Sequence, residues 1–378
     1  MGVAPEIVIP DHLRPTDGRF GSGPSRIRSA QLDALLAANP TILGTSHRQR
    51  PVKAEVGRLR EGLRTLFNLP DGYEVLLGNG GSTAFWDAAT FGLIRDRAQF
   101  LSFGEFGAKF AAAAASAPHL GDPDVRTAPA GSAPDFVAVP GLDAYASPHN
   151  ETSTGVTRPV RRPPGIDDDA LTIIDATSAA GGVAVDPTQF DVYYFAPQKS
   201  FGSDGGLWLA LVSPRALERI GQIQASGRWC PAFLDLAIAL ENSRADQTYN
   251  TPALATILLM SEQVTWFNAQ GGLGWATGRT AATSGHLYGW ADAHELTSPF
   301  VTDPQLRSPV VVTIDIDSSV AATTLTAVLR ANGIVDTEPY RKLGRNQIRI
   351  AVFPAVDLAD VQALTACCDY VLHRLADA

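Results

Sequence analysis

Asp175 and Lys199 are 24 residues apart, and each follows a short apolar run that is typical of a buried strand. Leu171–Ile174 leads directly into Asp175, and Lys199 comes three residues after the run Val192–Ala196. Ligands of open α/β sheets bind at the carboxyl ends of strands, so the two side chains are expected to meet in one crevice. Pyridoxal phosphate requires this pair, because a lysine forms its Schiff base and an aspartate keeps its pyridine nitrogen protonated.

The rarity of lysine in this chain makes Lys199 stand out. The 30 basic residues include only four lysines, and the other three, Lys53, Lys109 and Lys342, lie in polar, Ala-rich or basic segments. Burial at a strand end would lower the pKa of the Lys199 amine and make it nucleophilic. A lysine in such a place is more often simply solvated, but Asp175 and a glycine-rich loop favour the catalytic interpretation.

That glycine-rich loop follows another predicted strand, Glu74–Leu77. It runs from Gly78 into a helix predicted from Ser82, and the N–H groups and dipole at the start of a helix attract an anion. Gly81, Ser82 and Thr83 are therefore candidates for binding the phosphate of a cofactor. A dinucleotide loop is the alternative, but the third glycine of the GxGxxG pattern is absent.

Three further segments hold residues that could complete such a site. Phe106 follows a predicted strand and could stack on a pyridine ring, or belong to the core. His47 and Arg48 could bind phosphate or carboxylate, or form a solvated basic loop. Arg349 lies inside an apolar strand pattern, where it needs a carboxylate partner from either a substrate or the protein.

The composition is that of an ordinary globular protein. Its 378 residues, 45% of them hydrophobic and 18% charged, suffice for one large and one smaller domain. A net charge of −9 argues against nucleic-acid binding. No apolar run reaches membrane-spanning length, and the N-terminus lacks the features of a signal peptide. Cys230, Cys367 and Cys368 fit neither a metal site nor a disulfide framework, so a cytoplasmic protein without a metal is expected.

Strands and helices alternate along much of the chain, which predicts a mainly parallel sheet with helices on both faces. Long helical patterning covers Pro252 to about Tyr288, and a compact α+β unit follows, so a domain boundary is expected between about 270 and 300. Pro118–Pro140 is expected to be mostly surface loop. The predicted elements include the helices Gln31–Ala38, Val52–Phe67, Val320–Asn332 and Leu358–Leu375, helices from Ser82, Glu105 and Pro214, and the strands Glu74–Leu77, Gln99–Phe103, Leu207–Val212, Pro309–Ile316 and Gln347–Val352.

The sequence resembles the phosphoserine aminotransferase family over nearly its whole length, most closely the actinobacterial branch. That family belongs to the class V, fold-type I pyridoxal phosphate enzymes. The pair of Asp175 and Lys199 is shared by the whole superfamily, whereas the SHR and NET motifs are more specific. The segments that carry the resemblance are Ser22-Gly23-Pro24, Ser46-His47-Arg48, Gly80-Gly81-Ser82-Thr83, Asn150-Glu151-Thr152, Asp175, Gln198-Lys199 and Asn250-Thr251-Pro252.

The resemblance implies a large pyridoxal phosphate-binding α/β domain, residues 19–280, with a mainly parallel sheet. It also implies a smaller α+β C-terminal domain, residues 281–378 together with 1–18. In the cofactor site, Lys199 would form the internal aldimine and Asp175 would pair with the pyridinium nitrogen. The remaining contacts implied are Gly81, Ser82 and Gln198 at the phosphate, Phe106 on the ring and Thr152 at the phenolic oxygen.

The resemblance further implies a homodimer with shared active sites. Asn250 and Thr251 would reach the cofactor phosphate of the neighbouring subunit, and His47 and Arg48 would bind the substrate phosphate there. Arg349 would bind the substrate α-carboxylate. The implied reaction moves an amino group between L-glutamate and 3-phosphohydroxypyruvate, giving O-phospho-L-serine and 2-oxoglutarate, with phosphohydroxythreonine of pyridoxine biosynthesis as a related substrate.

Two departures from the family pattern concern the ring-stacking position and the second phosphate-binding arm. Many members carry Trp where this chain has Phe106. A His-Arg pair that precedes the carboxylate-binding arginine is missing, which leaves Arg341, Lys342 and Arg345 as candidates, and Arg345 is the one we select.

Other activities remain as alternatives at this point. One is another class V aminotransferase, such as alanine–glyoxylate or serine–pyruvate. Cysteine desulfuration would need a mobile cysteine near the cofactor, but Cys367 and Cys368 lie in the closing helix pattern and are expected in the core, which leaves Cys230. A non-catalytic dinucleotide-binding module would make Lys199 incidental.

Overall fold

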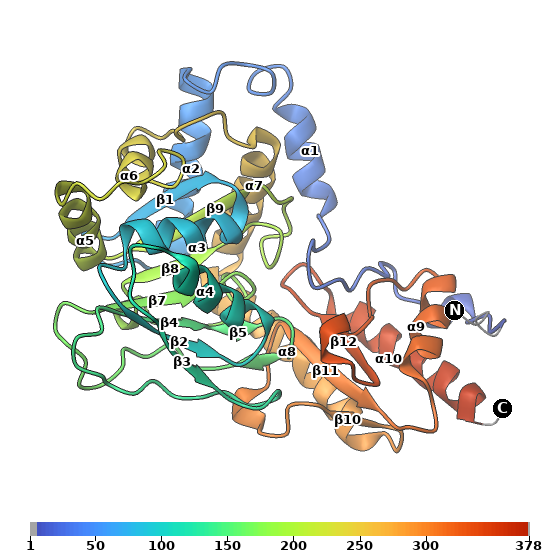
Figure 1. Cartoon of the computed structure of the whole chain (residues 1–378). Coiled ribbons are helices and arrows are strands. Elements are labelled where there is room, and N and C mark those ends of the chain that lie inside the picture. The colour runs from blue at the N-terminus through green and yellow to red at the C-terminus, as the bar shows by residue number, and fades with distance from the viewer. Residues whose placement is uncertain (1–5, 377–378) are drawn as a thin grey trace.

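A seven-stranded sheet forms the centre of the larger lobe in Figure 1, a computed structural model that describes residues 6–376. The strand order is β1-β9-β8-β7-β4-β2-β3, and only β9 runs antiparallel to its neighbours. The predicted mainly parallel α/β sheet is therefore confirmed. Its strands are β1 (Glu74–Asn79), β2 (Ala98–Ser102), β3 (Asp124–Thr127), β4 (Ala144–Pro148), β7 (Leu171–Asp175), β8 (Val192–Phe195) and β9 (Leu207–Val212).

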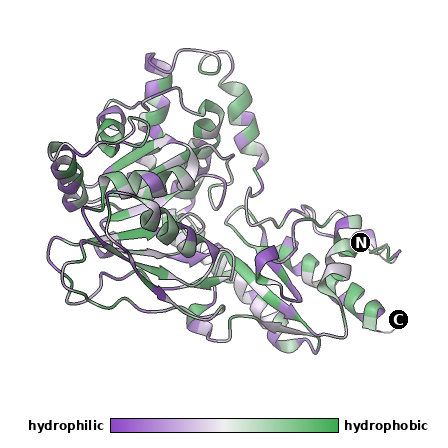
Figure 2. Cartoon of the chain, viewed as in Figure 1, coloured by the Kyte–Doolittle hydropathy of each residue, from purple (hydrophilic) through white to green (hydrophobic). Residues whose placement is uncertain are grey.

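Helices cover both faces of this sheet because its strands are apolar on both sides. In β1, Leu76 packs into one hydrophobic cluster, whereas Val75 and Leu77 pack into another on the opposite face. Figure 2 shows hydrophobic colour along the central strands and more hydrophilic colour on the outer helices. The first face is covered by α3 (Gly81–Gly92), α4 (Glu105–Ser116), α5 (Pro214–Ala225) and α6 (Leu236–Arg244), and the second by α2 (Arg50–Leu66), α7 (Leu254–Gln270) and the start of α8 (Gly272–Ala293).

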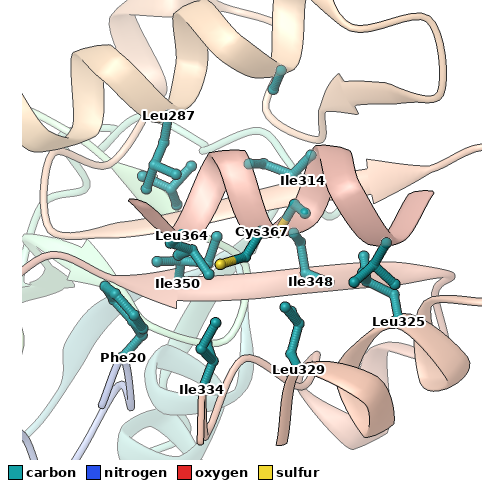
Figure 3. Packing of buried hydrophobic residues seen from close by; sticks show 14 of the residues in the cluster. Phe20, Leu287, Ile314, Leu325, Leu329, Ile334, Ile348, Ile350, Leu364 and Cys367 are labelled. Carbon is teal, nitrogen blue, oxygen red and sulfur yellow. The ribbon is translucent and has the colours of Figure 1, made fainter. Parts of the chain in front are cut away.

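The smaller lobe has a hydrophobic core of its own. Its three-stranded antiparallel sheet, order β10-β11-β12, packs against α10 and α9, and Figure 3 shows Ile314, Ile348 and Ile350 meeting Leu364 there. Phe20, from the N-terminal segment, closes this core. The elements are β10 (Thr297–Pro299), β11 (Val311–Ile316), α9 (Ala322–Ala331), β12 (Gln347–Ala351) and α10 (Leu358–Ala376).

The end of α8 contributes Leu287 to the core of the smaller lobe, while Ala276 of the same helix belongs to the larger one. This continuity is compatible with a boundary near residue 280, and the division into 19–280 and 281–378 with 1–18 stays a prediction. Residues 1–5 and 377–378 of that division lie outside the described residues.

Several elements differ from the sequence-based expectation. The long helical pattern from Pro252 is two helices, because Gly271 takes a positive φ of 123° and ends α7. The expected loop Pro118–Pro140 contains the edge strand β3. The predicted helix Gln31–Ala38 is present as α1 (Ser29–Ala37), whereas β4, α6 and the two-stranded β5 (Asn150–Glu151) and β6 (Val156–Thr157) were not predicted.

Candidate active site

The parallel strands β1, β2, β7 and β8 end at the same edge of the sheet, and a cavity of about 280 Å³ lies there. Asp175 is the last residue of β7, and Lys199 follows β8, so the topology brings the predicted pair together. The cavity is lined by Gly80, Gly81, Ser82, Thr83, Trp86, Phe106, Asn150, Thr152, Asp175, Thr177, Ser178, Gln198, Lys199 and Gly206.

Asp175 is buried and its carboxylate is held by three donors. Trp86 Nε1 and Tyr194 OH donate to Oδ2 at 3.2 and 2.9 Å. The backbone N–H of Thr177 donates to Oδ1 at 2.9 Å. Burial and the nearby carboxylate raise the pKa of Tyr194 well above its ordinary value, so its hydroxyl stays a donor at physiological pH. The arrangement fixes the aspartate in the orientation in which it faces the cavity.

Lys199 reaches the cavity through contacts with the N-terminal segment. Its Nζ donates to the carbonyl of Ser22 at 2.5 Å. Gly23 has φ +131°, and a Cβ there would lie 2.3 Å from Nζ. Burial, reinforced by the positive charge of Arg349, lowers the pKa of Lys199 to about 8. A larger share of the amine is therefore neutral near pH 7 than for an exposed lysine.

The glycine loop turns from β1 into α3 with positive φ values at Gly80 and Gly81, 111° and 69°. This conformation is open to glycine and leaves the first turn of α3 facing the cavity without a side chain in the way. Ser82 Oγ lies 2.7 Å from Thr177 Oγ1, and Thr83 also lines the cavity. The start of α3 therefore offers backbone N–H groups and hydroxyls to an anion.

Buried polar atoms without a hydrogen-bond partner show where a bound cofactor could supply one. Among the described residues, Gln198 Oε1, Asn150 Oδ1 and Arg349 Nε are buried and have no hydrogen-bond partner. An unmet buried polar group costs about 1–3 kcal/mol. Together with the carboxylate, the amine and the anion-binding helix end, these atoms fit pyridoxal phosphate and an amino-acid carboxylate.

Phe106, Thr152 and Arg349 are brought to the same region from three different elements. Phe106, in the first turn of α4, and Thr152, after β5, both line the cavity. Arg349, on β12, donates to the carbonyl of Thr152 at 3.1 Å and lies over the ring of Tyr340. Burial lowers the pKa of Arg349.

The segments expected to serve a neighbouring subunit do not line the cavity of their own chain. His47 Nδ1 lies 3.3 Å from Thr251 Oγ1, and Arg48 donates to the carbonyl of Tyr249 at 3.2 Å. Asn79, at the end of β1, donates to Asn250 Oδ1 at 2.9 Å. These residues form one exposed cluster beside the glycine loop.

The three basic candidates for a substrate phosphate separate in space. Arg345 does not line the cavity, because it pairs with Asp315 (Nε to Oδ1, 3.1 Å) and stacks over Phe300. Lys342 pairs with Glu105 and lines a neighbouring hollow. Arg341 is exposed. The structure thus gives Arg345 a protein partner in place of the expected substrate contact.

Sequence reasoning missed Trp86, Tyr194 and the role of Glu151 inside its motif. Trp86 and Tyr194 stand in apolar runs, where an aromatic side chain indicates core, and no local signal marks them as donors to Asp175. Glu151 is fully buried and accepts the N–H groups of Phe106 and Gly107.

Comparison with known proteins identifies the family. Residues 140–337 match the aminotransferase class-V family. A protein of Mycolicibacterium vanbaalenii is 61% identical over 373 residues, 99% of this chain and 100% of its own length. The phosphoserine aminotransferase of Rhodococcus jostii is 58% identical over 368 residues, 97% of this chain and 98% of its own. The chain belongs to the class V aminotransferase family.

The fold of this class V aminotransferase is that of a solved phosphoserine aminotransferase from Cytophaga hutchinsonii. The TM-score is 0.86 at 23% identity, over 94% of this chain and 99% of the other. The chain is a pyridoxal phosphate-dependent transaminase. None of its helices within residues 6–376 combines the length and apolar character that a membrane crossing requires. Over the same range, no group of three or more His, Cys, Asp or Glu side chains could hold a metal ion.

Proposed function

We propose that this class V aminotransferase exchanges an amino group between L-glutamate and 3-phosphohydroxypyruvate, giving O-phospho-L-serine and 2-oxoglutarate. The observation that carries the proposal is the convergence of Asp175, Lys199 and the start of α3 in one cavity. The near-full-length identity of 58% to a phosphoserine aminotransferase supports the choice of substrate. The proposal places the reaction in the cytoplasm, as a step of serine biosynthesis, with phosphohydroxythreonine of pyridoxine biosynthesis as a second substrate.

The residues have distinct tasks in this reaction. When bound, pyridoxal phosphate draws the bonding electrons of the substrate α-carbon into its ring. Asp175 holds the proton on the ring nitrogen, and its three donors keep the carboxylate oriented. Lys199 Nζ, with its pKa lowered to about 8, would take the proton from the substrate α-carbon and deliver it to C4′ of the cofactor. The same transfer would run in reverse when the keto acid is aminated.

Arg349 is the proposed partner of the substrate carboxylate. Its Nε is buried and unpaired among the described residues, and a guanidinium fork binds a carboxylate through two parallel hydrogen bonds. Both substrates carry an α-carboxylate and occupy the same cavity in turn, so ping-pong kinetics are expected. Gln198, Gly81, Ser82 and Thr83 are the proposed phosphate contacts of the cofactor, with Phe106 on its ring and Thr152 at its phenolic oxygen.

Substrate phosphate binding is assigned to a partner subunit in a homodimer. His47, Arg48, Asn250 and Thr251 cluster at the surface and leave the cavity of their own chain untouched. His47 Nε2 is buried without a partner among the described residues. A two-fold axis near this cluster would place it at the second cavity, and the same contact would occur twice.

The alternatives have less support. Cys367 and Cys368 are fully buried, which confirms the expected core position. Burial raises the pKa of Cys230 to about 11, and this thiol lies in a surface hollow formed with Trp229 and Arg228, separate from the residues that line the cavity. A desulfurase nucleophile requires an accessible thiolate. An alanine–glyoxylate or serine–pyruvate aminotransferase shares the cofactor chemistry, so only the choice of keto acid separates it from our proposal.

Steady-state kinetics with glutamate and three keto acids tests the proposal. We expect kcat/KM for 3-phosphohydroxypyruvate to exceed those for glyoxylate and pyruvate by at least about 100-fold, because the unphosphorylated acids leave the phosphate-binding groups unpaired. Arg48→Ala should lower the phosphorylated substrate's kcat/KM and leave the other two unchanged. A preference for glyoxylate or pyruvate would establish the alternative activity instead.

A further inference from the structure

The first turn of α4 is capped by a remote segment of the chain. Gly104 precedes the helix and offers no side-chain cap. Instead, Glu151 Oε2 accepts the N–H groups of Phe106 and Gly107, each at 3.1 Å. Ser153 Oγ accepts the N–H of Glu105 at 3.0 Å. Three of the four free N–H groups at this helix end are therefore satisfied by the end of β5 and the turn that follows it.

Glu151 is enclosed on every side. The side chain is fully buried, and its second oxygen, Oε1, accepts the N–H and the hydroxyl of Ser153 at 3.2 and 2.7 Å. A Cβ on Gly104, the residue before α4, would lie 2.3 Å from Glu151 Cγ. Glycine at position 104 therefore leaves the space that the Glu151 side chain occupies. Burial raises the pKa of Glu151, while the hydrogen bonds from Ser153 and from the backbone N–H of Gly107 act in the opposite direction.

The turn that carries Glu151 also carries groups of the active site. The next residue, Thr152, lines the cavity, and its carbonyl accepts a hydrogen bond from Arg349. Glu151 therefore ties the backbone of Phe106 to the segment that holds Thr152 and Arg349. A shift of this carboxylate would move residues on two sides of the cavity together.

Two helix ends that could attract the cofactor phosphate lie at the same edge of the sheet. The starts of α3 and α4 each follow a glycine after a strand, and both have the positive dipole end that favours an anion. The N-terminal end of α4 already binds the Glu151 carboxyl group. The N-terminal end of α3 faces the cavity and has no acidic residue in its first turn.

We propose that Glu151 is a positioning residue: it fixes the Phe106 backbone at the cavity and keeps external anions away from α4, so that the cofactor binds in one orientation with its phosphate at α3. The proposal rests on the proposed function only through the cofactor contacts of Phe106 and Thr152. It does not depend on which keto acid the enzyme uses.

The test compares Glu151→Ala and Glu151→Gln with a matched control, Asp143→Asn. Asp143 is also buried and accepts three backbone N–H groups, at 2.8 to 2.9 Å, but it stands before β4 at the opposite edge of the sheet. Pyridoxal phosphate is titrated into each cofactor-free protein, and the visible circular dichroism of the bound cofactor is recorded. These readouts need no substrate, so they are separate from a failure of the substrate assignment.

Glu151→Ala is expected to raise the Kd for the cofactor about tenfold, equivalent to about 1.4 kcal/mol, and to weaken the dichroism of the bound cofactor. Added acetate, which fits the vacated carboxylate position, should restore both the Kd and the dichroism. Acetate would not restore them if the substitution had only lowered the stability of the protein. Glu151→Gln keeps one acceptor oxygen and should show the same change to a smaller degree. Asp143→Asn should lower the melting temperature and leave the cofactor signals unchanged.

A wild-type Kd and dichroism in Glu151→Gln and Glu151→Ala would overturn the proposal. It would equally be overturned if Asp143→Asn changed the cofactor signals as much, because the effect would then follow stability alone. Should Glu151→Ala fail to fold, Glu151→Gln decides: altered dichroism supports the positioning role, and an unaltered signal refutes it.

Discussion

Gly23 and Lys199 are packed so closely that any side chain at position 23 would have to displace the Lys199 amine. A Cβ at Gly23 would lie 2.3 Å from Lys199 Nζ, and the backbone there has φ +131°. Gly23→Ala is expected to displace the amine and reduce transamination on the order of 100-fold, as small misplacements of a catalytic group do. Cofactor titration and steady-state assays would measure both effects.

Gly141→Ala is the matched control for this substitution. Gly141 also has a positive φ, +80°, but no atom lies within 4 Å of its added Cβ. It should lose stability, by about 1–3 kcal/mol for the strained backbone, and keep the cofactor affinity. If Gly23→Ala behaves like Gly141→Ala, the contact with Lys199 does not matter for the reaction.

The three donors to Asp175 predict graded effects. Asp175→Asn should retain some cofactor and lose activity by about 100-fold or more, because a neutral amide cannot stabilise a protonated ring nitrogen. Tyr194→Phe removes one hydrogen bond to a charged group, worth about 1.5–3 kcal/mol, and should lower both kcat and the free energy of unfolding. Chemical denaturation and turnover of the two variants provide the comparison. Wild-type turnover in Asp175→Asn would rule out that Asp175 keeps the ring nitrogen protonated so that the ring can accept electrons.

The lowered pKa of Lys199 predicts how the cofactor-free protein depends on pH. The rate of covalent cofactor capture should rise with a midpoint near pH 8, whereas an ordinary lysine titrates near 10.5. Since the folded protein binds this proton less tightly than the unfolded chain, the lysine is destabilising below pH 8, and that cost disappears as pH rises from about 8 to 10.5.

Stopped-flow absorbance over this pH range measures the capture rate. Unfolding of wild type and Lys199→Met at each pH isolates the contribution of the lysine, and the difference between them should shrink toward pH 10.5. A capture midpoint near 10.5 would contradict the burial of the amine.

Shared active sites predict complementation between two variants that are both impaired toward the phosphorylated keto acid. Arg48 donates within its own chain to Gln247 Oε1 and the Tyr249 carbonyl and lies outside the cavity. If it acts across the dimer, a heterodimer of Arg48→Ala and Lys199→Ala chains has one cavity with both groups intact. Mixed, tag-purified heterodimers should then recover up to half of the wild-type activity, one of two sites. Heterodimers no more active toward the phosphorylated keto acid than the parents would show that Arg48 does not act on the partner.

Much of the fold could be predicted from the sequence because its strands are short, buried and apolar. The runs before Asp175 and Lys199 carried that signal, and their parallel pairing followed from alternation with helices. The strand β4, with the sequence AYASP, was missed because small and polar residues replace the usual β-branched ones. The antiparallel direction of β9 leaves no local trace in sequence.

The active site was predictable only where the residue type and its local sequence indicate a chemical role. Asp175, Lys199 and the glycine loop did so, and the structure places them in one cavity. Trp86 and Tyr194 could not be found, since their donor role depends on a tertiary contact with Asp175. Arg345 was one of three basic candidates near Arg349, but in the fold it precedes β12 and binds Asp315 of β11.

The most direct measurement of the central claim locates the lysine that carries the cofactor. The holoenzyme is reduced with borohydride, digested, and the labelled peptide is identified by mass spectrometry, with Lys199→Ala as the control. We expect a single label on Lys199, lost in the variant, because this is the lysine in the cavity with a pKa lowered to about 8. A label on Lys53, Lys109 or Lys342, or none at all, would contradict it.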